Sequence, residues 1–196
     1  MLLTESGQEI PCICITNRRL CKGDFYEKIK EIAAAGVADA IILREKDLPE
    51  ETYFQMADRV MRICEEFQTP CIPHTYLKSA QLLHCQNIHL PLGVLEKMEQ
   101  KEKDSFEKIG SSVHSLEQAE RAYELGADYV TAGHVFETDC KKGIPGRGTG
   151  FLSEICKRIR IPVYGIGGVS KENAESIIKA GAKGVCLMSG FMNGTL

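Results

Sequence analysis

Short apolar segments alternate with helical patterns along the whole chain, and this alternation restricts the fold more than any other feature. The predicted strands are Cys12–Thr16, Ala40–Arg44, Cys71–Pro73, Asn87–Leu90, Lys108–Ser112, Tyr129–Ala132, Pro162–Gly165 and Gly184–Met188. The predicted helices between them are Phe25–Ala35, Glu50–Phe67, Leu77–His84, Val94–Lys103, Leu116–Leu125, Phe151–Ile159 and Lys171–Ala180. Strands that alternate with helices in this way form parallel sheets.

The number of strands and the length of the chain together indicate a closed sheet. Eight such units in 196 residues predict a compact (β/α)8 TIM barrel. An open doubly wound sheet is the alternative, because periodicity alone does not show whether a sheet closes. No linker or low-complexity stretch interrupts the pattern, so we expect residues 1–196 to form one domain.

The chain ends soon after the last predicted strand. Only Ser189–Leu196 follow it, which is too short for a full eighth helix, so we expect the last helix to be truncated or missing. The outer face of strand Gly184–Met188 would then be partly uncovered. A partner subunit, and hence a homodimer, is one way to shield it; otherwise it remains a liability.

Charge and composition exclude several classes of function. The formal net charge of -3 gives no broad basic surface, so nucleic acid is not an expected partner. No segment approaches the about 18 apolar residues that span a membrane, and the polar N-terminus lacks a secretory pattern. The nine cysteines are odd in number and include no Cys-x-x-Cys pair, which favours reduced thiols. We therefore expect a cytoplasmic protein without a membrane partner.

A long polar loop, residues 133–150, follows the predicted strand Tyr129–Ala132. It contains five glycines, the imidazole of His134 and three cations, Lys141 among them. Glycines let a loop approach an anion closely, and an imidazole exchanges protons near neutral pH. Because the loops after the strands carry the active site of a (β/α)8 barrel, this loop is the first candidate for function.

Two turns after the last two predicted strands indicate a phosphate site. Gly165–Gly168 reads Gly-Ile-Gly-Gly and precedes Ser170, which we expect to cap the next helix. Ser189-Gly190 follows the last strand, and loops seven and eight form the recurrent phosphate site of such barrels. For the glycine motif alone, a tight structural turn is the alternative.

Polar side chains also stand at the ends of other predicted strands. Arg44 adds a cation, while His74 and Ser112 hold equivalent positions on the third and fifth strands. Residues 84–89 include metal-ligating types, but they straddle a helix end and a strand start, so their side chains should diverge. We expect a cationic, glycine-lined mouth for a small phosphorylated molecule, with no metal.

With these motifs the chain resembles the thiamine phosphate synthase superfamily, and within it the TenI-type thiazole tautomerases. The resemblance runs from about Cys12 to Gly190 and is strongest in Ile109–Glu117, Gly126–Val130, Gly133–Gly143, Gly165–Gly168 and Met188–Gly190. Arg44–Lys46 is similar to the tail of the synthase motif after the second strand. The match in the long loop is specific to the superfamily, whereas the two short glycine motifs occur in many phosphate-binding barrels.

Departures from the synthase pattern favour the tautomerases. Synthases carry Asn-Asp after the third strand and a further aspartate after the fourth, and their magnesium ion neutralises the departing pyrophosphate. This chain has His74-Thr75 and His89–Gly93 at those places, so both metal carboxylates are missing. Ile42 also stands where synthases have a glutamine.

The resemblance implies an isomerase that aromatises a carboxylated dihydrothiazole phosphate to the thiazole carboxylate phosphate. It implies that His134 moves the proton without metal or organic cofactor, and that the backbone near Gly167, Gly168, Ser189 and Gly190 holds the phosphate. Contacts to the ring or carboxylate are expected from Thr138, Lys141, Arg44, Ser112 and His74. Two alternatives stay open: a divergent, magnesium-dependent thiamine phosphate synthase, and a phosphate-ligand-binding regulatory barrel without catalysis.

Overall fold

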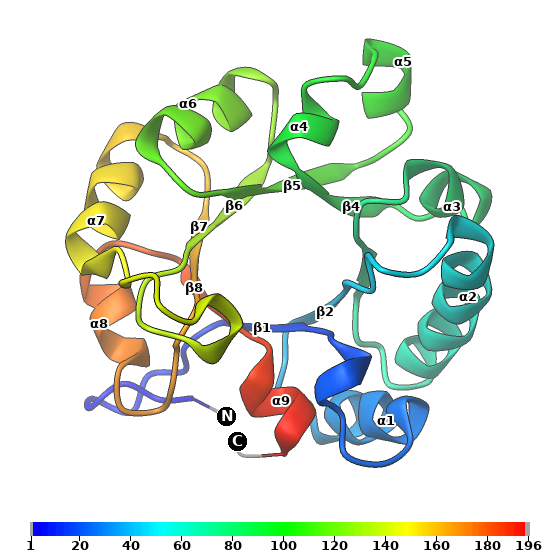
Figure 1. The fold of residues 1–196 in the computed structure, drawn as a ribbon, viewed down its shortest axis with the longest axis horizontal. Helices are drawn as coiled ribbons and strands as arrows, with labels where there is room; N and C mark the ends of the chain where they lie inside the picture. Colours follow the sequence, from blue (N-terminus) through cyan, green and yellow to red (C-terminus); the bar gives the residue numbers. More distant parts are fainter. Residues whose placement is uncertain (1, 195–196) are drawn as a thin grey trace.

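All eight predicted strands form, and they lie parallel in one sheet. The computed structural model describes residues 2–194. The strands are β1 (Cys12–Ile15), β2 (Ala40–Leu43), β3 (Cys71–Pro73), β4 (Asn87–Pro91), β5 (Lys108–Val113), β6 (Tyr129–Gly133), β7 (Val163–Ile166) and β8 (Gly184–Leu187). Figure 1 views the barrel end-on, so that the strands form a ring and the helices lie outside it.

The sheet closes almost completely into a barrel. Its strand order is β3-β2-β1-β8-β7-β6-β5-β4. The two strands at the ends of this order, β3 and β4, meet through one parallel bridge between His74 and His89. Beside that bridge, the N–H of Thr75 donates to the carbonyl oxygen of His89 at 3.0 Å. The predicted (β/α)8 barrel is therefore confirmed, and the open sheet is wrong.

Helices follow the strands nearly as predicted, with one clear difference. They are α1 (Phe25–Ala35), α2 (Glu50–Glu66), α3 (Leu77–Leu82), α4 (Leu92–Leu95), α5 (Gln100–Lys103), α6 (Leu116–Glu124), α7 (Gly148–Arg158), α8 (Ala174–Lys179) and α9 (Ser189–Asn193), with short 3-10 turns η1 (Arg18–Leu20) and η2 (Asp139–Lys141). The single helix predicted over Val94–Lys103 is two short helices. Glu99 between them is extended, and its N–H donates to the Glu102 carboxylate at 2.9 Å, which starts α5 afresh.

Two kinds of interior fill the barrel. Ile13, Ile15, Ala40, Ile42, Ile72 and Cys186 form an apolar cluster inside β1, β2, β3 and β8. Polar side chains occupy the inner face of the other half, where His89 on β4, Ser112 on β5 and Thr131 on β6 lie within hydrogen-bond distance of one another. Alternate residues of these strands, such as Ile88 and Val130, face the helices instead and are fully buried.

The expectation of an uncovered face on β8 is wrong. Every residue of β8 is buried within the single chain. Leu2 and Ile10 of the N-terminal hairpin and Phe191 and Met192 of α9 belong to the same buried cluster as Val185 and Leu187. The last helix is truncated as predicted, since α9 spans five residues, while residues 195–196 of the predicted tail lie outside the described part. A homodimer stays a prediction, but it no longer follows from exposed apolar surface.

The sequence also led us to expect reduced thiols and no membrane-spanning segment. All nine cysteines are free, and Cys12, Cys14, Cys64, Cys85 and Cys186 are buried, as small apolar side chains would be. Within residues 2–194, no helix combines the length and the apolarity that a bilayer crossing requires. A cytoplasmic location stays a prediction.

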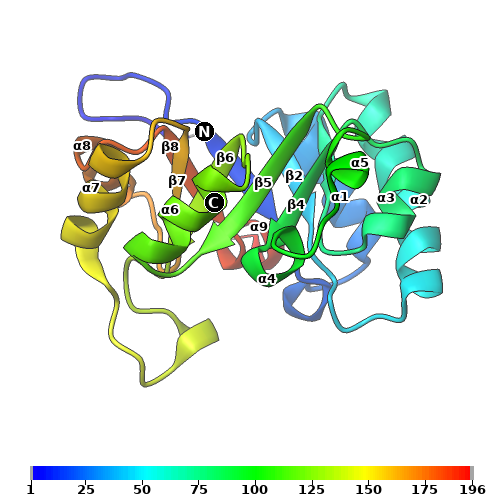
Figure 2. The same ribbon diagram turned by 90° about the horizontal axis from the view of Figure 1, so that it is seen from above.

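Figure 2 turns the barrel on its side and separates its two ends. The long β6–α7 loop projects from one end, and the N-terminal hairpin lies at the other, near α8. The hairpin is closed by a bridge between Leu3 and Glu9. The end with the β6–α7 loop is therefore the end where the strands finish and where a functional site is expected.

We expect Tyr53→Phe to lower the free energy of unfolding by about 2 kcal/mol, because it removes a hydroxyl that serves two buried backbone groups. The Tyr53 hydroxyl donates to the Leu43 carbonyl at 2.8 Å and accepts from the His74 N–H at 2.9 Å. Urea unfolding measures the loss. Tyr123→Phe, which removes a hydroxyl from a side chain that is 42% exposed, is the matched control and should change stability little. Equal effects of the two changes would contradict the role of Tyr53.

Candidate functional site

A cavity of about 360 Å³ opens where the strands finish. Its wall includes residues that follow β2, β3, β5 and β6, namely Arg44, Lys46, His74, His114 and His134. The β6–α7 loop adds Thr138, Cys140 and Lys141, and the turns after β7 and β8 add Gly167, Gly168 and Ser189. Segments far apart in the sequence thus meet around one space, in the position of an active site.

The charged side chains around this cavity are cations. Arg44, Lys46 and Lys141 line it, and no aspartate or glutamate of residues 2–194 does. Glu137 and Asp139 line an adjoining hollow of about 610 Å³ instead. The described residues contain no group of three or more His, Cys, Asp or Glu side chains that could hold a metal ion. The cavity therefore favours an anionic ligand.

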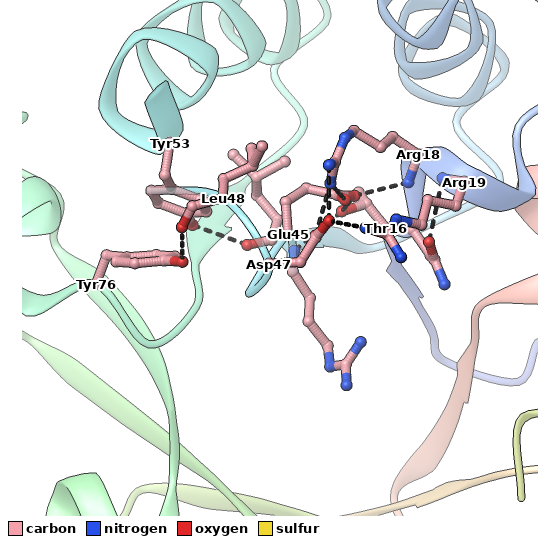
Figure 3. Close-up of polar contacts among 11 residues, drawn as sticks. Thr16, Arg18, Arg19, Glu45, Asp47, Leu48, Tyr53 and Tyr76 are labelled. Carbon is pink, nitrogen blue, oxygen red and sulfur yellow. Dashed lines mark hydrogen bonds and ion pairs between the residues drawn. The ribbon is translucent and has the colours of Figure 1, made fainter. Parts of the chain in front are cut away.

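A buried hydrogen-bond network fixes the start of the loop that carries Arg44 (Figure 3). Thr16 Oγ1 accepts from the Arg44 N–H at 2.9 Å and donates to Glu45 Oε1 at 2.8 Å. The Glu45 carboxylate, 2% exposed, also accepts from the backbone N–H and the guanidinium of Arg18. Arg18 in turn holds the pKa of Asp47 below its usual value through a hydrogen bond of 2.7 Å. The acids of this segment are therefore engaged away from the cavity, and Arg44 is left to line it.

His134 directly follows β6 and is 6% exposed. Its Nε2 lies 3.1 Å from the carbonyl oxygen of Ile144 in the β6–α7 loop. A carbonyl oxygen only accepts, so Nε2 carries a hydrogen, and the neutral ring then has its lone pair on Nδ1. One nitrogen of His134 is thus fixed as a donor, and the other is available for proton transfer.

The turn after β7 lies directly against His134, and this explains its glycines. Gly167 and Gly168 have φ angles of 97° and 65°, in the left-handed region that favours glycine. A Cβ on Gly167 would lie 2.3 Å from the Cβ of His134, and one on Gly168 would lie 2.2 Å from the carbonyl oxygen of Glu137. Close approach to the β6–α7 loop therefore requires glycine at both positions.

The helix after this turn begins later than predicted. Asn173, and not Ser170, precedes the first residue of α8. Its Oδ1 accepts from the Ser170 N–H at 2.8 Å, and its Nδ2 donates to the Gly168 carbonyl at 2.9 Å. The predicted cap at Ser170 is wrong because Asn173 holds residues 170–173 as a separate turn. That turn still anchors Gly168 beside the cavity.

Uncharged imidazoles lie deeper in the cavity, on the polar side of the barrel. The rings of His74 and His89 stack with their centroids 5.5 Å apart. Burial lowers the pKa of His89 to about 3, with a further contribution from Arg44. Burial also lowers the pKa of His74 well below its usual value, and His89 acts in the same direction. Both rings are therefore neutral at physiological pH, although they lie near cations.

Nearly all of the predicted site residues come together. His134, Gly167, Gly168, Ser189, Thr138, Lys141, Arg44, Ser112 and His74 line the cavity, whereas Gly190, the second residue of α9, is not among its lining residues. Their roles stay predictions. The cavity also contains Lys46, His89, His114 and Thr131, which the sequence analysis did not select. Strand alternation could have found His89 and Thr131, because both share the inner face with Ser112.

Fold and cavity together place the chain among the (β/α)8 barrels with a ligand site at the C-terminal ends of the strands, where enzymes of this fold have their active sites. The sequence model of one family, described as thiamine monophosphate synthase, matches residues 12–191. The chain belongs to this family.

Named relatives extend over most of the chain. It is 32% identical over 182 residues to a thiamine-phosphate synthase of Fusobacterium nucleatum, an alignment that covers 91% of this chain and 87% of the relative. A thiamine-phosphate synthase of Clostridium acetobutylicum is 29% identical over 181 residues, covering 91% and 85%. The solved structure of thiamine phosphate pyrophosphorylase from Pyrococcus furiosus superposes with a TM-score of 0.78 at 30% identity, covering 94% of this chain and 88% of that one.

More distant structures share the fold alone. The N-acetylmannosamine-6-phosphate 2-epimerase of Clostridium perfringens superposes with a TM-score of 0.66 at 13% identity, covering 95% of this chain and 89% of that one. The barrel architecture is therefore common to proteins of different sequence, and the side chains at the cavity must decide the function.

We expect the free energy of unfolding to fall as the pH is lowered from 6.5 towards 3. The pKa of His89 is about 3 in the folded state against 6.5 when unperturbed, so the unfolded chain takes up the proton first. This stability is present above the unfolded pKa and is lost as the pH falls, by up to about 1.4 kcal/mol per pH unit. Urea unfolding at several pH values measures the slope.

Two variants test whether the slope comes from the buried ring. His89→Gln should reduce the slope and leave the part that comes from His74, whereas His84→Asn, which removes an exposed histidine, should leave it as in the wild type. The same slope in all three proteins would contradict a neutral, buried His89.

Proposed function

We propose that this chain is a thiazole tautomerase that aromatises a carboxylated dihydrothiazole phosphate by metal-independent proton transfer. The observation that carries the proposal is a cavity with three cations, an oriented imidazole and no lining carboxylate among the described residues. Three cations suit a ligand that bears both a phosphate and a carboxylate. In this proposal the glycine turn after β7 and Ser189 after β8, which line the cavity, hold the phosphate, as the corresponding loops do in other barrels of this kind.

His134 supplies the chemistry in this proposal. Nδ1 takes a proton from the ring of the substrate, and the resulting imidazolium returns that proton to the exocyclic carbon of the former double bond. The bond from Nε2 to the Ile144 carbonyl keeps the lone pair on Nδ1 before the reaction and stabilises the imidazolium after it. No atom is gained or lost, so the reaction requires neither an oxidant nor a second substrate.

A magnesium ion does not fit the side chains of this cavity. Magnesium binds through carboxylate and phosphate oxygens, and the lining residues offer imidazoles and cations instead. Glu137 and Asp139 lie in the adjoining hollow, and Glu45 is held by Thr16 and Arg18. The proposal therefore assigns no step to a metal.

The second candidate is a thiamine phosphate synthase, a magnesium-dependent transferase. The names of the relatives favour it over the tautomerase, since the two bacterial relatives and the Pyrococcus furiosus structure are named for the transfer reaction. The two candidates share a thiazole phosphate as ligand and differ in the need for carboxylates that hold a metal. Sequence identity of about 30% leaves room for such a change at a conserved fold.

One assay separates the candidates. Purified protein is mixed with the carboxylated dihydrothiazole phosphate in EDTA, and aromatisation is followed by NMR or ultraviolet absorbance. Acceleration over the buffer rate supports the tautomerase. No acceleration, together with thiamine phosphate formed from the pyrimidine diphosphate and thiazole phosphate only with magnesium, would establish the synthase. Tight binding of the thiazole phosphate without turnover in either assay would indicate a regulatory barrel.

We expect His134→Asn to lower the rate of aromatisation by about two to four orders of magnitude, the usual effect of removing an acid–base group. Circular dichroism should show that the variant remains folded. His84→Asn makes the same exchange on an exposed side chain and should keep the wild-type rate. Wild-type turnover in the His134 variant would remove this residue from the reaction.

A further inference from the structure

Three side chains of neighbouring strands form a hydrogen-bonded row inside the barrel. The Tyr129 hydroxyl on β6 lies 3.1 Å from Nδ1 of His89 on β4, and Nε2 of the same ring lies 2.8 Å from Ser112 Oγ on β5. Thr131 Oγ1 donates to Ser112 Oγ at 3.3 Å. Ser112 lines the cavity, so the row connects the barrel interior to the site of the ligand.

Gly110 on β5 leaves the space that the ring of Tyr129 occupies. A Cβ on Gly110 would lie 2.1 Å from the ring of Tyr129, so only glycine at this position on β5 admits the tyrosine. The ring is 9% exposed, and burial raises the pKa of its hydroxyl, which therefore keeps its proton. An apolar side chain would fill this space without the hydroxyl.

Two arrangements of hydrogens are possible along the row, because the His89 ring is neutral. In the first, the Tyr129 hydroxyl donates to Nδ1 and the hydrogen on Nε2 is donated to Ser112. In the second, Nδ1 donates to Tyr129 and Ser112 donates to Nε2. His89 is the only hydrogen-bond partner of the Tyr129 hydroxyl within the described part of the chain, so the second arrangement leaves a buried hydroxyl hydrogen without an acceptor. That cost favours the first.

The first arrangement also decides what Ser112 can do. Ser112 Oγ then accepts from His89 Nε2 and from Thr131 Oγ1, which uses both of its lone pairs. The only hydrogen bond that Ser112 Oγ can still make is the one that it donates. Ser112 lines the cavity, so an acceptor oxygen of a bound ligand can meet this hydrogen there.

We infer that Tyr129 and His89 are positioning residues that fix the Ser112 hydroxyl as a hydrogen-bond donor to an acceptor oxygen of the ligand. Ser112 thereby rejects a ligand that offers a donor at this point and prefers one that offers a carboxylate. The inference rests on the proposed function only for the identity of that acceptor, which is the carboxylate of the thiazole.

The row itself can be tested without any ligand. Nitrogen NMR of the free protein, labelled at histidine nitrogens, distinguishes the two neutral forms of the His89 ring. The inference expects the hydrogen on Nε2. Tyr129→Phe removes only the hydroxyl and should release this preference, while the ring still fills the space beside Gly110. A hydrogen on Nδ1 of His89 in the wild type would overturn the inference, whatever the protein binds.

Binding shows whether the row acts on the ligand. Calorimetry compares the thiazole carboxylate phosphate with the same compound lacking the carboxylate. Ser112→Ala and Tyr129→Phe should weaken binding of the carboxylated compound by about tenfold, the worth of a hydrogen bond to a charged group, and leave the other compound unaffected. His89→Gln, which keeps an N–H near the position of Nε2, should retain more affinity than His89→Leu.

The matched control is Tyr164→Phe on β7. Its ring lies edge-to-face with that of Tyr129, with centroids 5.9 Å apart, and its hydroxyl makes no hydrogen bond within residues 2–194. This variant should bind both compounds as the wild type does. Equal weakening of both compounds in Tyr129→Phe would indicate a structural role and overturn the inference. A wild type that binds neither compound would overturn the proposed function and the ligand assignment, while the NMR result would still decide the row.

Discussion

The seam between β3 and β4 is the constraint on which the rest of the structure depends. The barrel closes there through one bridge between His74 and His89, and the two rings stack beside it. Two charged imidazoles with centroids 5.5 Å apart would repel each other in a poorly solvated place. Closure of the barrel buries both rings, and this burial lowers their pKa values and keeps them uncharged. The cavity is therefore lined there by neutral hydrogen-bonding groups.

The division of the barrel interior explains how a small protein holds a rigid site. One half is filled by aliphatic side chains, which need no partners and pack tightly. The other half is filled by hydroxyls and imidazoles that satisfy one another across β4, β5 and β6. Cations then appear only at the rim, where Arg44, Lys46 and Lys141 remain close to water. Charged side chains thus line the mouth of the cavity, and neutral polar side chains lie deeper in the barrel.

Most of the fold was accessible from the sequence, because strand and helix periodicities are local signals. The strands end within one residue of their predicted positions, and α1 spans Phe25–Ala35 as predicted. The break at Glu99 and the late start of α8 were missed, since each depends on a side-chain hydrogen bond that competes with helix formation. The burial of β8 was missed because residues outside the regular pattern, Leu2 and Ile10 among them, join the same buried cluster.

The site was less accessible, because it depends on which side chains meet across the ring. Strand ends located Arg44, His74 and His134, but the partnership of His89 with Tyr129 needs the register between β4, β5 and β6. No local pattern contains that information. A resemblance to a family carries it only where the same side chains recur at the cavity.

The bond between His134 Nε2 and the Ile144 carbonyl joins residues at the start and the middle of the long β6–α7 loop. Only when the loop lies in this position is the proton confined to Nε2 and the lone pair to Nδ1. Displacement of Ile144 would let the proton occupy either nitrogen, and part of the population would then present the wrong face to a substrate. The position of the β6–α7 loop therefore decides which nitrogen of His134 faces the cavity with a free lone pair.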